Sequence, residues 1–215
     1  MPKRPQIPSQ LDVVIDPILD DSSEWERCEL SGELVGEVTD GVELSECRIK
    51  SLRMTGAHLV RSRVRDCRFE QCELSGAIFE AAAFERVEFV DCRLSGAVLS
   101  DDRLRHVRFH RCRMDGIVLR MASTIELVIQ DCQLPAADLY GSDLSGSTIV
   151  DSDLSGADIS NAQLSGAKLH GTDLADVVGG GAALRDVQID AGQVVPVALL
   201  VFEGLGISIT ERPTI

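Results

Sequence analysis

The sequence repeats a pattern every five residues, and this pattern restricts the fold more than any other feature of the chain. From Leu44 to Leu174, every fifth residue is bulky and apolar, with Thr124 as the one exception among 27 positions. The residue two places earlier is mostly small, usually Ala, Ser or Cys. An α-helix has a period of 3.6 residues and a β-strand a period of two, so neither element explains the pattern. A short extended segment followed by a tight turn explains the pattern, with two side chains of every five pointing inward.

A second period of 20 residues is superimposed on the first. The segments CELSGAIF, CRLSGAVL and CRMDGIVL begin 20 residues apart, at Cys72, Cys92 and Cys112. Four repeats of five therefore predict a four-sided coil, and 27 repeats predict nearly seven such coils. At a strand spacing of about 4.8 Å, the shaft would be about 32 Å long. Such a solenoid buries its core only between neighbouring coils.

The 20-residue alignment also predicts columns of like residues. Phe69, Phe89 and Phe109 should form one inward column. A set of glycines should occupy one corner, where a turn with positive φ favours glycine. These are Gly56, Gly76, Gly96 and Gly116.

The seven cysteines fall in the small inward position of the repeat. Six follow the main frame: Cys47, Cys67, Cys72, Cys92, Cys112 and Cys132. Cys28 fits an earlier frame with Trp25, Leu30 and Val35 as bulky positions, and a four-residue slip at Val38–Gly41 would join the two frames. The chain has no CxxC motif and no Cys/His cluster, so zinc is not expected. We interpret the cysteines as buried packing thiols.

Several repeats are close copies of the consensus A(D/N)LXX, namely ADLYG (137–141), SDLSG (142–146 and 152–156), ADISN (157–161) and TDLAD (172–176). In these motifs the chain resembles the pentapeptide-repeat family. The resemblance implies an all-β solenoid, a right-handed quadrilateral parallel β-helix, in agreement with the four-sided coil. We divide the chain into an N-terminal extension (1–41), the repeat shaft (42–176) and a C-terminal capping and dimerisation segment (177–215). The extension could form an irregular first coil, a cap or a partner-specific arm.

The segment VQIDAGQVVPVALLVFEGLGISI (187–209) is similar to the ending of the MfpA-like and Qnr-like quinolone-resistance proteins. That resemblance implies a short final helix that joins two shafts end to end as a homodimer. Asp190 is a candidate N-cap and Gly204 a candidate stop, and Pro196 places the start of the regular helix near Val195. The helix is apolar nearly all round, so it either only caps the last coil or also forms the dimer interface. The interface candidates are Val194, Val197, Leu199, Leu200, Phe202 and Leu205.

Charge is distributed unevenly along the chain. Residues 1–46 have a net charge of −9, residues 47–120 of +5 and residues 121–184 of −8. Pairing of the C-terminal ends would bring two acidic segments together at the centre of a rod, where they would suit a basic groove. The aspartate that precedes the central leucine is also the family consensus, so its presence can be purely structural. The candidates for this acidic surface are Asp138, Asp143, Asp151, Asp153, Asp158, Asp173 and Asp176.

Three irregular features do not follow from the repeat. Asp102 occupies a small inward position, where it would satisfy turn amides or splay the corner, and Thr124 occupies a central one. Ile78, Val98 and Val118 form an outward column that is either an apolar stripe for a partner or ordinary surface aliphatics.

Composition excludes several classes of protein. The net charge of −14 argues against direct binding to nucleic acid or anionic membranes. No run of 18 apolar residues and no secretory signal is present, so we expect no membrane span and a cytoplasmic, reducing location. The four histidines have no Ser, Cys or carboxylate partner at a recognisable motif spacing. We therefore expect no enzyme, no cofactor and no metal.

The family resemblance implies a function. In the MfpA-like and Qnr-like proteins, the rod resembles B-DNA and occupies the DNA-binding saddle of DNA gyrase. This chain would accordingly be a DNA mimic that binds a type II topoisomerase, DNA gyrase or topoisomerase IV, and protects or regulates it against gyrase-directed toxins or fluoroquinolones. Immunity to one natural toxin through the same enzyme is a further alternative. The alternative of a different class is a scaffold or signalling module that binds another protein.

Overall fold

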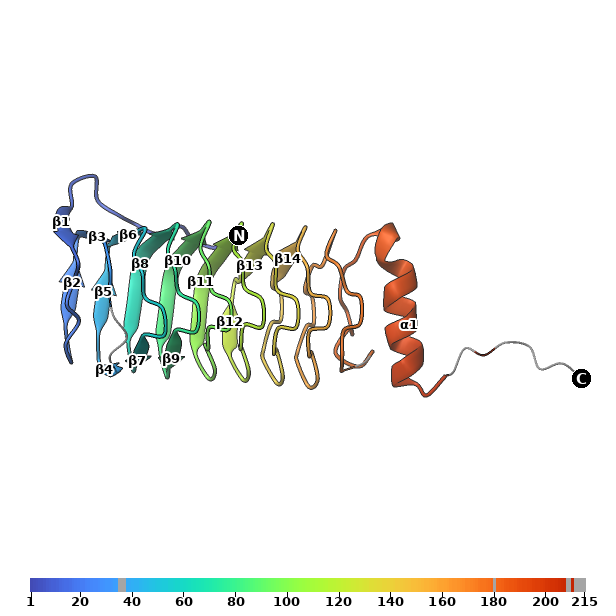
Figure 1. Cartoon of the computed structure of the whole chain (residues 1–215). Helices are drawn as coiled ribbons and strands as arrows, with labels where there is room; N and C mark the ends of the chain where they lie inside the picture. The colour runs from blue at the N-terminus through green and yellow to red at the C-terminus, as the bar shows by residue number, and fades with distance from the viewer. Residues whose placement is uncertain (35–37, 180, 208–209, 211–215) are drawn as a thin grey trace, which may run out of the picture.

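Five-residue segments form the sides of a square coil, and about seven coils stack into a right-handed quadrilateral parallel β-helix (Figure 1). The computed structural model describes residues 1–34, 38–179, 181–207 and 210. The described strands are β1 (Asp12–Ile15), β2 (Glu24–Glu26), β3 (Cys28–Ser31), β4 (Val38–Asp40), β5 (Glu43–Ser45), β6 (Arg48–Lys50), β7 (His58–Val60), β8 (Arg63–Glu70), β9 (Ile78–Glu80), β10 (Ala83–Val90), β11 (Arg103–His110), β12 (Ser123–Ile125), β13 (Val128–Gln130) and β14 (Thr148–Val150). A 3₁₀ turn (Ala191–Gln193) and helix α1 (Val194–Gly204) follow at the C-terminal end.

The strands pair in parallel with partners one coil away. Strands β8, β10 and β11 lie in exact 20-residue register, as in the pairs Val87 with Cys67 and Val87 with Val107. We number the four sides of the coil in chain order by their central columns. The first side contains Leu104, the second Phe109, the third Leu94 and the fourth Leu99. The 20-residue circuit predicted from the sequence is confirmed.

The core is a set of stacked columns that fill the inside of the shaft. The rings of Phe69 and Phe89 stack with centroids 4.7 Å apart, and those of Phe89 and Phe109 with centroids 4.8 Å apart. This spacing equals the distance between neighbouring strands, so the rings follow the backbone repeat. Leu94 and Leu99, the central residues of the third and fourth sides, are fully buried. Each central residue therefore packs against the coils above and below it.

The small inward position has a hydrogen-bonding role. The backbone N–H of Cys72 donates to Sγ of Cys92 (3.4 Å), and that of Cys112 donates to Sγ of Cys132 (3.3 Å). Farther along, the N–H of Cys132 donates to Oγ of Ser152 (3.1 Å). The Cys or Ser side chain at the small inward position thus accepts a hydrogen bond from the backbone N–H of the corresponding residue in the preceding coil. All seven cysteines are buried and free, which confirms the expectation of packing thiols.

The corner glycines adopt the predicted backbone conformation. Gly76 and Gly96 both have φ of +65°, which costs a side chain about 1 kcal/mol or more. The turn is closed by a hydrogen bond from Ala97 N to Leu94 O (3.0 Å).

The N-terminal extension adds an irregular coil to the shaft. Strand β3 pairs with β6 with an offset of 19 residues, since Leu30 faces Ile49. The offset becomes 20 residues at Glu33, which bridges to Arg53. The frame therefore changes around Gly32, which has φ of +100°, and the slip predicted at Val38–Gly41 is wrong. The reason is that Leu34, buried at 8% exposure, takes the bulky position that we assigned to Val35. Val35 itself lies outside the described residues.

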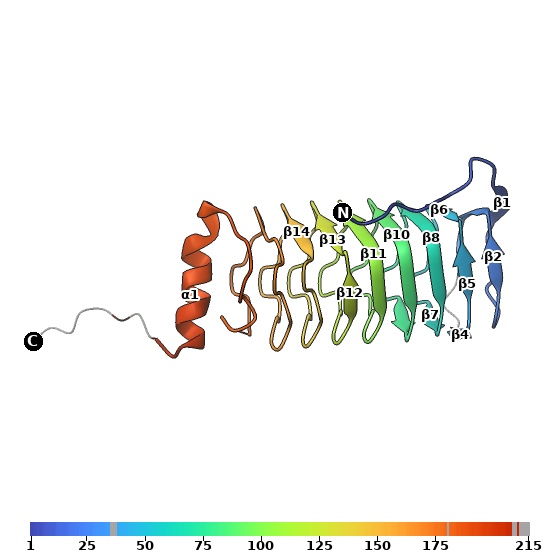
Figure 2. The same ribbon diagram turned by 180° about the vertical axis from the view of Figure 1, so that it is seen from behind.

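Residues 1–8 form an extended arm that runs back over the shaft from β1 towards β11 (Figures 1 and 2). Gln6 donates its backbone N–H to Oδ1 of Asp66 (3.0 Å). Nε of Arg4 lies 4.0 Å from Oε1 of Glu88, one coil farther along. Pro2 is buried. The arm lies near the corner between the first and second sides.

Candidate partner-binding surfaces

The structure distributes the seven predicted aspartates over several sides of the C-terminal coils. Asp153 and Asp173 stack on the third side, and Asp138 and Asp158 stack on the fourth. Asp176 lies in the chain between these two sides. The other two lie elsewhere: Asp143 is on the first side and Asp151 at the corner that follows the second. Five of the seven therefore lie along two adjacent sides, which we call the acidic surface.

Most of these aspartates also hold the local turn. Oδ1 of Asp153 accepts the N–H of Ser155 (2.8 Å), and Oδ1 of Asp158 accepts the N–H of Ser160 (2.8 Å). Asp138, Asp143 and Asp173 accept the N–H two residues on in the same way. Such Asx turns explain why the repeat favours Asp at this position. Side-chain and backbone hydrogen bonds from Ser160 lower the pKa of Asp158, so its carboxylate is charged at neutral pH.

The acidic surface is mostly free of ion pairs. Asp138 is paired with Arg120 (2.8 Å) and is the one member of the seven aspartates with an ion-pair partner in the described part of the chain. Asp151, Asp173 and Asp176 are exposed, and the other four are half-buried. The negative charge of these coils is therefore available to a basic partner.

The arginine-rich middle of the shaft is different, because many of its cations are neutralised by carboxylates one coil away. Arg86 contacts both oxygens of Asp66 at 2.7 Å. Arg111 contacts both oxygens of Asp91 at 2.7 and 2.8 Å, and the hydrogen bond from Arg111 lowers the pKa of Asp91. Further ion pairs join neighbouring coils near the N-terminal end of the shaft. They are Arg27 with Glu46, Arg48 with Glu29, Arg61 with Asp40 and Arg63 with Glu43.

The C-terminal cap is fixed by two side chains. Asp190 is the N-cap, as predicted, and its Oδ2 also accepts the N–H of Gly171 (2.6 Å). Nε2 of buried Gln193 donates to the carbonyls of Leu169 (2.6 Å) and Thr172 (2.7 Å), and the Leu169 carbonyl also accepts the backbone N–H of Thr172 (3.2 Å). Gln193 was missed in the sequence, although the spacing of Asp190 and Gln193 is that of a capping box. Helix α1 begins at Val194 and ends at Gly204, close to the predicted limits.

Five of the six predicted interface residues divide between two faces of α1, and the sixth, Leu205, directly follows the helix. Leu200 is buried against the shaft, and Val197 packs against the core. Four others are exposed: Leu199 (49%), Phe202 (39%), Val194 (55%) and Leu205 (70%). Leu200 and Val197 therefore belong to the cap, and the remaining four form an exposed apolar face at the end of the shaft.

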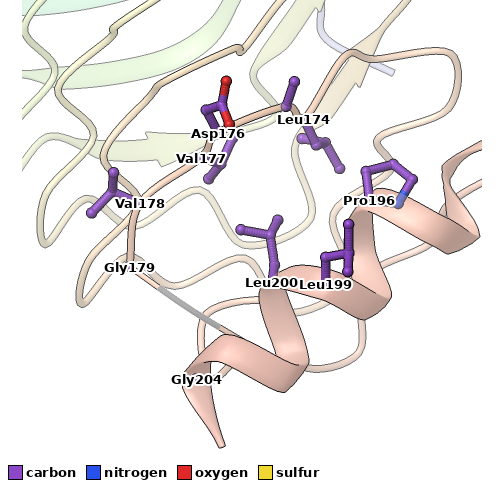
Figure 3. Close-up of a pocket in the computed structure, with 10 residues that line it drawn as sticks. Leu174, Asp176, Val177, Val178, Gly179, Pro196, Leu199, Leu200 and Gly204 are labelled. Carbon is purple, nitrogen blue, oxygen red and sulfur yellow. The ribbon is translucent and has the colours of Figure 1, made fainter. Parts of the chain in front are cut away.

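A cleft of about 680 Å³ separates part of α1 from the last coil. Figure 3 shows Leu199 and Leu200 of α1 on one side and Leu174 and Val177 of the coil on the other. Val178, at the edge of the cleft, is 57% exposed. The helix thus covers the end of the core incompletely and leaves apolar surface open beside its exposed face.

Asp102 and Thr124 are both accommodated inside the shaft. Oδ1 of Asp102 accepts the N–H of Ala82 (2.7 Å), the role that thiols perform elsewhere, while its Oδ2 is buried without a described partner. Burial raises the pKa of Asp102 to about 7. Oγ1 of Thr124 donates to the carbonyl of Asp143 (2.8 Å).

The remaining candidates contribute little to a site. Ile78, Val98 and Val118 form the predicted column on the fourth side, but each is only half exposed. Among the described residues, no group of three His, Cys, Asp or Glu side chains could hold a metal ion. No helix within the described ranges has the length and apolar character needed to cross a bilayer.

Comparison with known proteins agrees with this architecture. Two family models match the sequence: the pentapeptide repeat region at residues 62–134 and the eight-copy pentapeptide repeats at residues 137–176, together more than half of the chain. No curated protein matches the sequence.

Similar solved structures include QnrB1, a plasmid-mediated fluoroquinolone resistance protein, with 21% identity, a TM-score of 0.41 and coverage of 88% of this chain and 100% of QnrB1. HetL, a pentapeptide repeat protein involved in heterocyst differentiation regulation in the cyanobacterium Nostoc, has 19% identity and a TM-score of 0.38, covering 84% of this chain and 88% of HetL. These similarities concern the fold alone. The repeat, the four-sided coil and the two family matches show that the chain belongs to the pentapeptide-repeat family.

Proposed function

We propose that this chain is a non-enzymatic interaction protein that forms an end-to-end homodimer through α1 and presents its acidic surface to the basic DNA-binding saddle of DNA gyrase or topoisomerase IV. Occupation of the saddle would inhibit the enzyme or release it from a drug–DNA complex. With seven free thiols, the protein suits a reducing cytoplasm.

The main support is the combination of charge and apolar surface at one end of the molecule. The C-terminal coils carry aspartates that are largely unpaired, and next to them Leu199 and Phe202 of α1 and the following Leu205 are exposed. Pairing two copies through α1 would cover this apolar face and the nearby cleft, since contiguous apolar patches usually mark an interface. The same pairing would join the two acidic surfaces.

The alternative is a scaffold that binds a different protein. It is favoured by the arginine-rich coils, because a uniformly negative DNA mimic has no need of their cations. The experiments below separate the two functions.

The dimer is tested by light scattering on Leu199→Glu/Phe202→Glu. We expect a dimer of the 23.3 kDa chain to become a monomer, because two carboxylates would be buried in an apolar interface. Ile15→Glu, at a 68% exposed position of β1, is the matched control and should remain a dimer. An unchanged mass for the α1 variant would rule out this interface.

The partner is tested by supercoiling with purified gyrase, with and without a fluoroquinolone. We expect the protein to inhibit supercoiling or reduce drug-induced cleavage. In Asp153→Asn/Asp158→Asn/Asp173→Asn, each Asn keeps the acceptor for the turn and removes the charge, so the effect should weaken while the fold is retained.

The control variant for charge removes three acidic groups at the opposite end of the shaft: Asp12→Asn, Asp20→Asn and Glu24→Gln. It should act as the wild type does. The absence of any effect of the wild-type protein on gyrase would reject the topoisomerase and leave the scaffold. Equal weakening by the two variants would show that total charge, and not the acidic surface, is recognised.

A further inference from the structure

The N-terminal arm and the second side of the shaft together form a basic pocket. Its volume is about 330 Å³, and it lies beside β8, β10 and β11 on the second side, whereas the acidic surface lies on the third and fourth sides. The arm contributes one cation and the shaft contributes the rest, from successive coils. The charged residues and the histidine that line it are Arg4, Arg68, Arg108, Arg111, His110 and Glu88.

Most of the cations around the pocket are already paired. Arg68 contacts Glu70 (2.5 Å) and Glu88 (3.0 Å), and the other oxygen of Glu88 lies 4.0 Å from Arg4. Arg111 is held by Asp91, as described above. The carboxylate of Glu88 is therefore shared by two arginines, which limits its repulsion of an incoming anion.

Arg108 is the exception. It faces Glu88 in the strand register, yet Glu88 binds Arg68 instead, and Arg108 has no ion-pair partner in the described ranges of the chain. Its Nε is buried and donates no hydrogen bond to a described residue. Nδ1 of the adjacent His110 is also buried, 3.5 Å from the carboxylate of Asp131. A buried donor without an acceptor is costly, by about 1–3 kcal/mol.

We propose that this pocket binds a small phosphoryl anion, such as pyrophosphate or a compact organic phosphate. The planar fork of a guanidinium matches the oxygens of a phosphate, which would supply the acceptor that Arg108 lacks. The volume is at the low end for ligand sites, which run from about 300 to 1,000 Å³, and this favours a small ligand. The ligand would contact Arg4 and Arg108 together and thereby fasten the arm to the shaft.

The test is isothermal titration of the full-length protein with inorganic pyrophosphate at constant ionic strength, accompanied by thermal melts. We expect saturable binding and a raised melting temperature. Arg108→Gln should weaken binding roughly 10- to 100-fold through loss of a charge-assisted hydrogen bond. Arg4→Gln should weaken it less, because the Arg4 side chain is largely exposed and Glu88 already faces it.

Arg113→Gln is the matched control, because Arg113 is exposed on the third side of the same coil. It should bind as the wild type does. Circular dichroism would verify that each variant keeps the fold. An absence of saturable binding, or equal losses in Arg108→Gln and Arg113→Gln, would overturn the proposal. A short single-stranded oligodeoxynucleotide should not bind, and its binding through Arg108 would overturn the assignment to a small ligand.

Discussion

Replacement of Asp102 by asparagine should make the stability of the shaft less dependent on pH. The side chain is fully buried, one oxygen accepts the N–H of Ala82, and the other has no described partner. Burial raises the pKa of Asp102 to about 7, from an ordinary value of 3.8. In the pH interval between these two values, the folded chain keeps a proton that the unfolded chain has lost.

The sign and size of the effect follow from this difference. Unfolding then releases a proton, so this group stabilises the fold fully below about pH 4, and its contribution falls by about 1.4 kcal/mol per pH unit up to about pH 7. The total loss is about 4 kcal/mol. Asparagine keeps the acceptor for Ala82 and has no charge, so Asp102→Asn should gain stability relative to the wild type across this interval and hold the gain above it.

The assay is urea unfolding followed by circular dichroism at several values between pH 4 and 9. The free-energy difference between variant and wild type should increase with pH and level off above about pH 7. Asp101→Asn is the control, because Asp101 is adjacent and exposed; its charge is the smallest of the causes that set the pKa of Asp102, so the pH dependence should change only slightly. A difference that does not vary with pH would show that Asp102 is not protonated in the folded state.

Four further substitutions, at three positions, test the packing, the cap and one corner by urea unfolding. Leu94→Ala should cost about 2–5 kcal/mol, because it leaves a cavity between three coils; a loss below 1 kcal/mol would contradict the deduced register. Gln193→Ala should destabilise the cap by about 1–3 kcal/mol by removing its hydrogen bonds to the carbonyls of Leu169 and Thr172, and hydrogen exchange should increase first in the last coil. Gly96→Ala should cost about 1 kcal/mol and Gly96→Asn less, since asparagine tolerates positive φ better; equal stability of all three proteins would argue against backbone strain at this corner.

The regular part of the fold can be predicted from the sequence because each coil has the same pattern of inward and outward residues. A bulky residue every fifth position sets the sides, and the 20-residue repeat sets the stacking. The sides occupied by the aspartates follow from the same arithmetic: Asp153 and Asp173 differ by 20 residues and therefore share a side.

Other features depend on contacts that no repeat encodes. Leu34 and Val35 are adjacent and both apolar, so either could occupy the bulky inward position, and the frame could change before or after them. The packing of Leu34 in the core decides between the two. Residues 1–8 carry no repeat, and the contact of Gln6 with Asp66 spans 60 residues. The division of α1 into a buried face at Leu200 and an exposed face at Phe202 depends on how the helix docks on the last coil.

The N-terminal arm has a consequence for the order in which the chain can be completed during synthesis. A solenoid of this kind can add coils one after another as it leaves the ribosome, because each coil needs only its predecessor. The arm does not follow this order, since Arg4 and Gln6 dock on Glu88 and Asp66, which are made much later. The arm, which is made before the coils, must therefore wait, unattached, until several of them exist. Its docking then links coils that are not otherwise in contact. The coils that the arm spans should therefore unfold together as one cooperative unit.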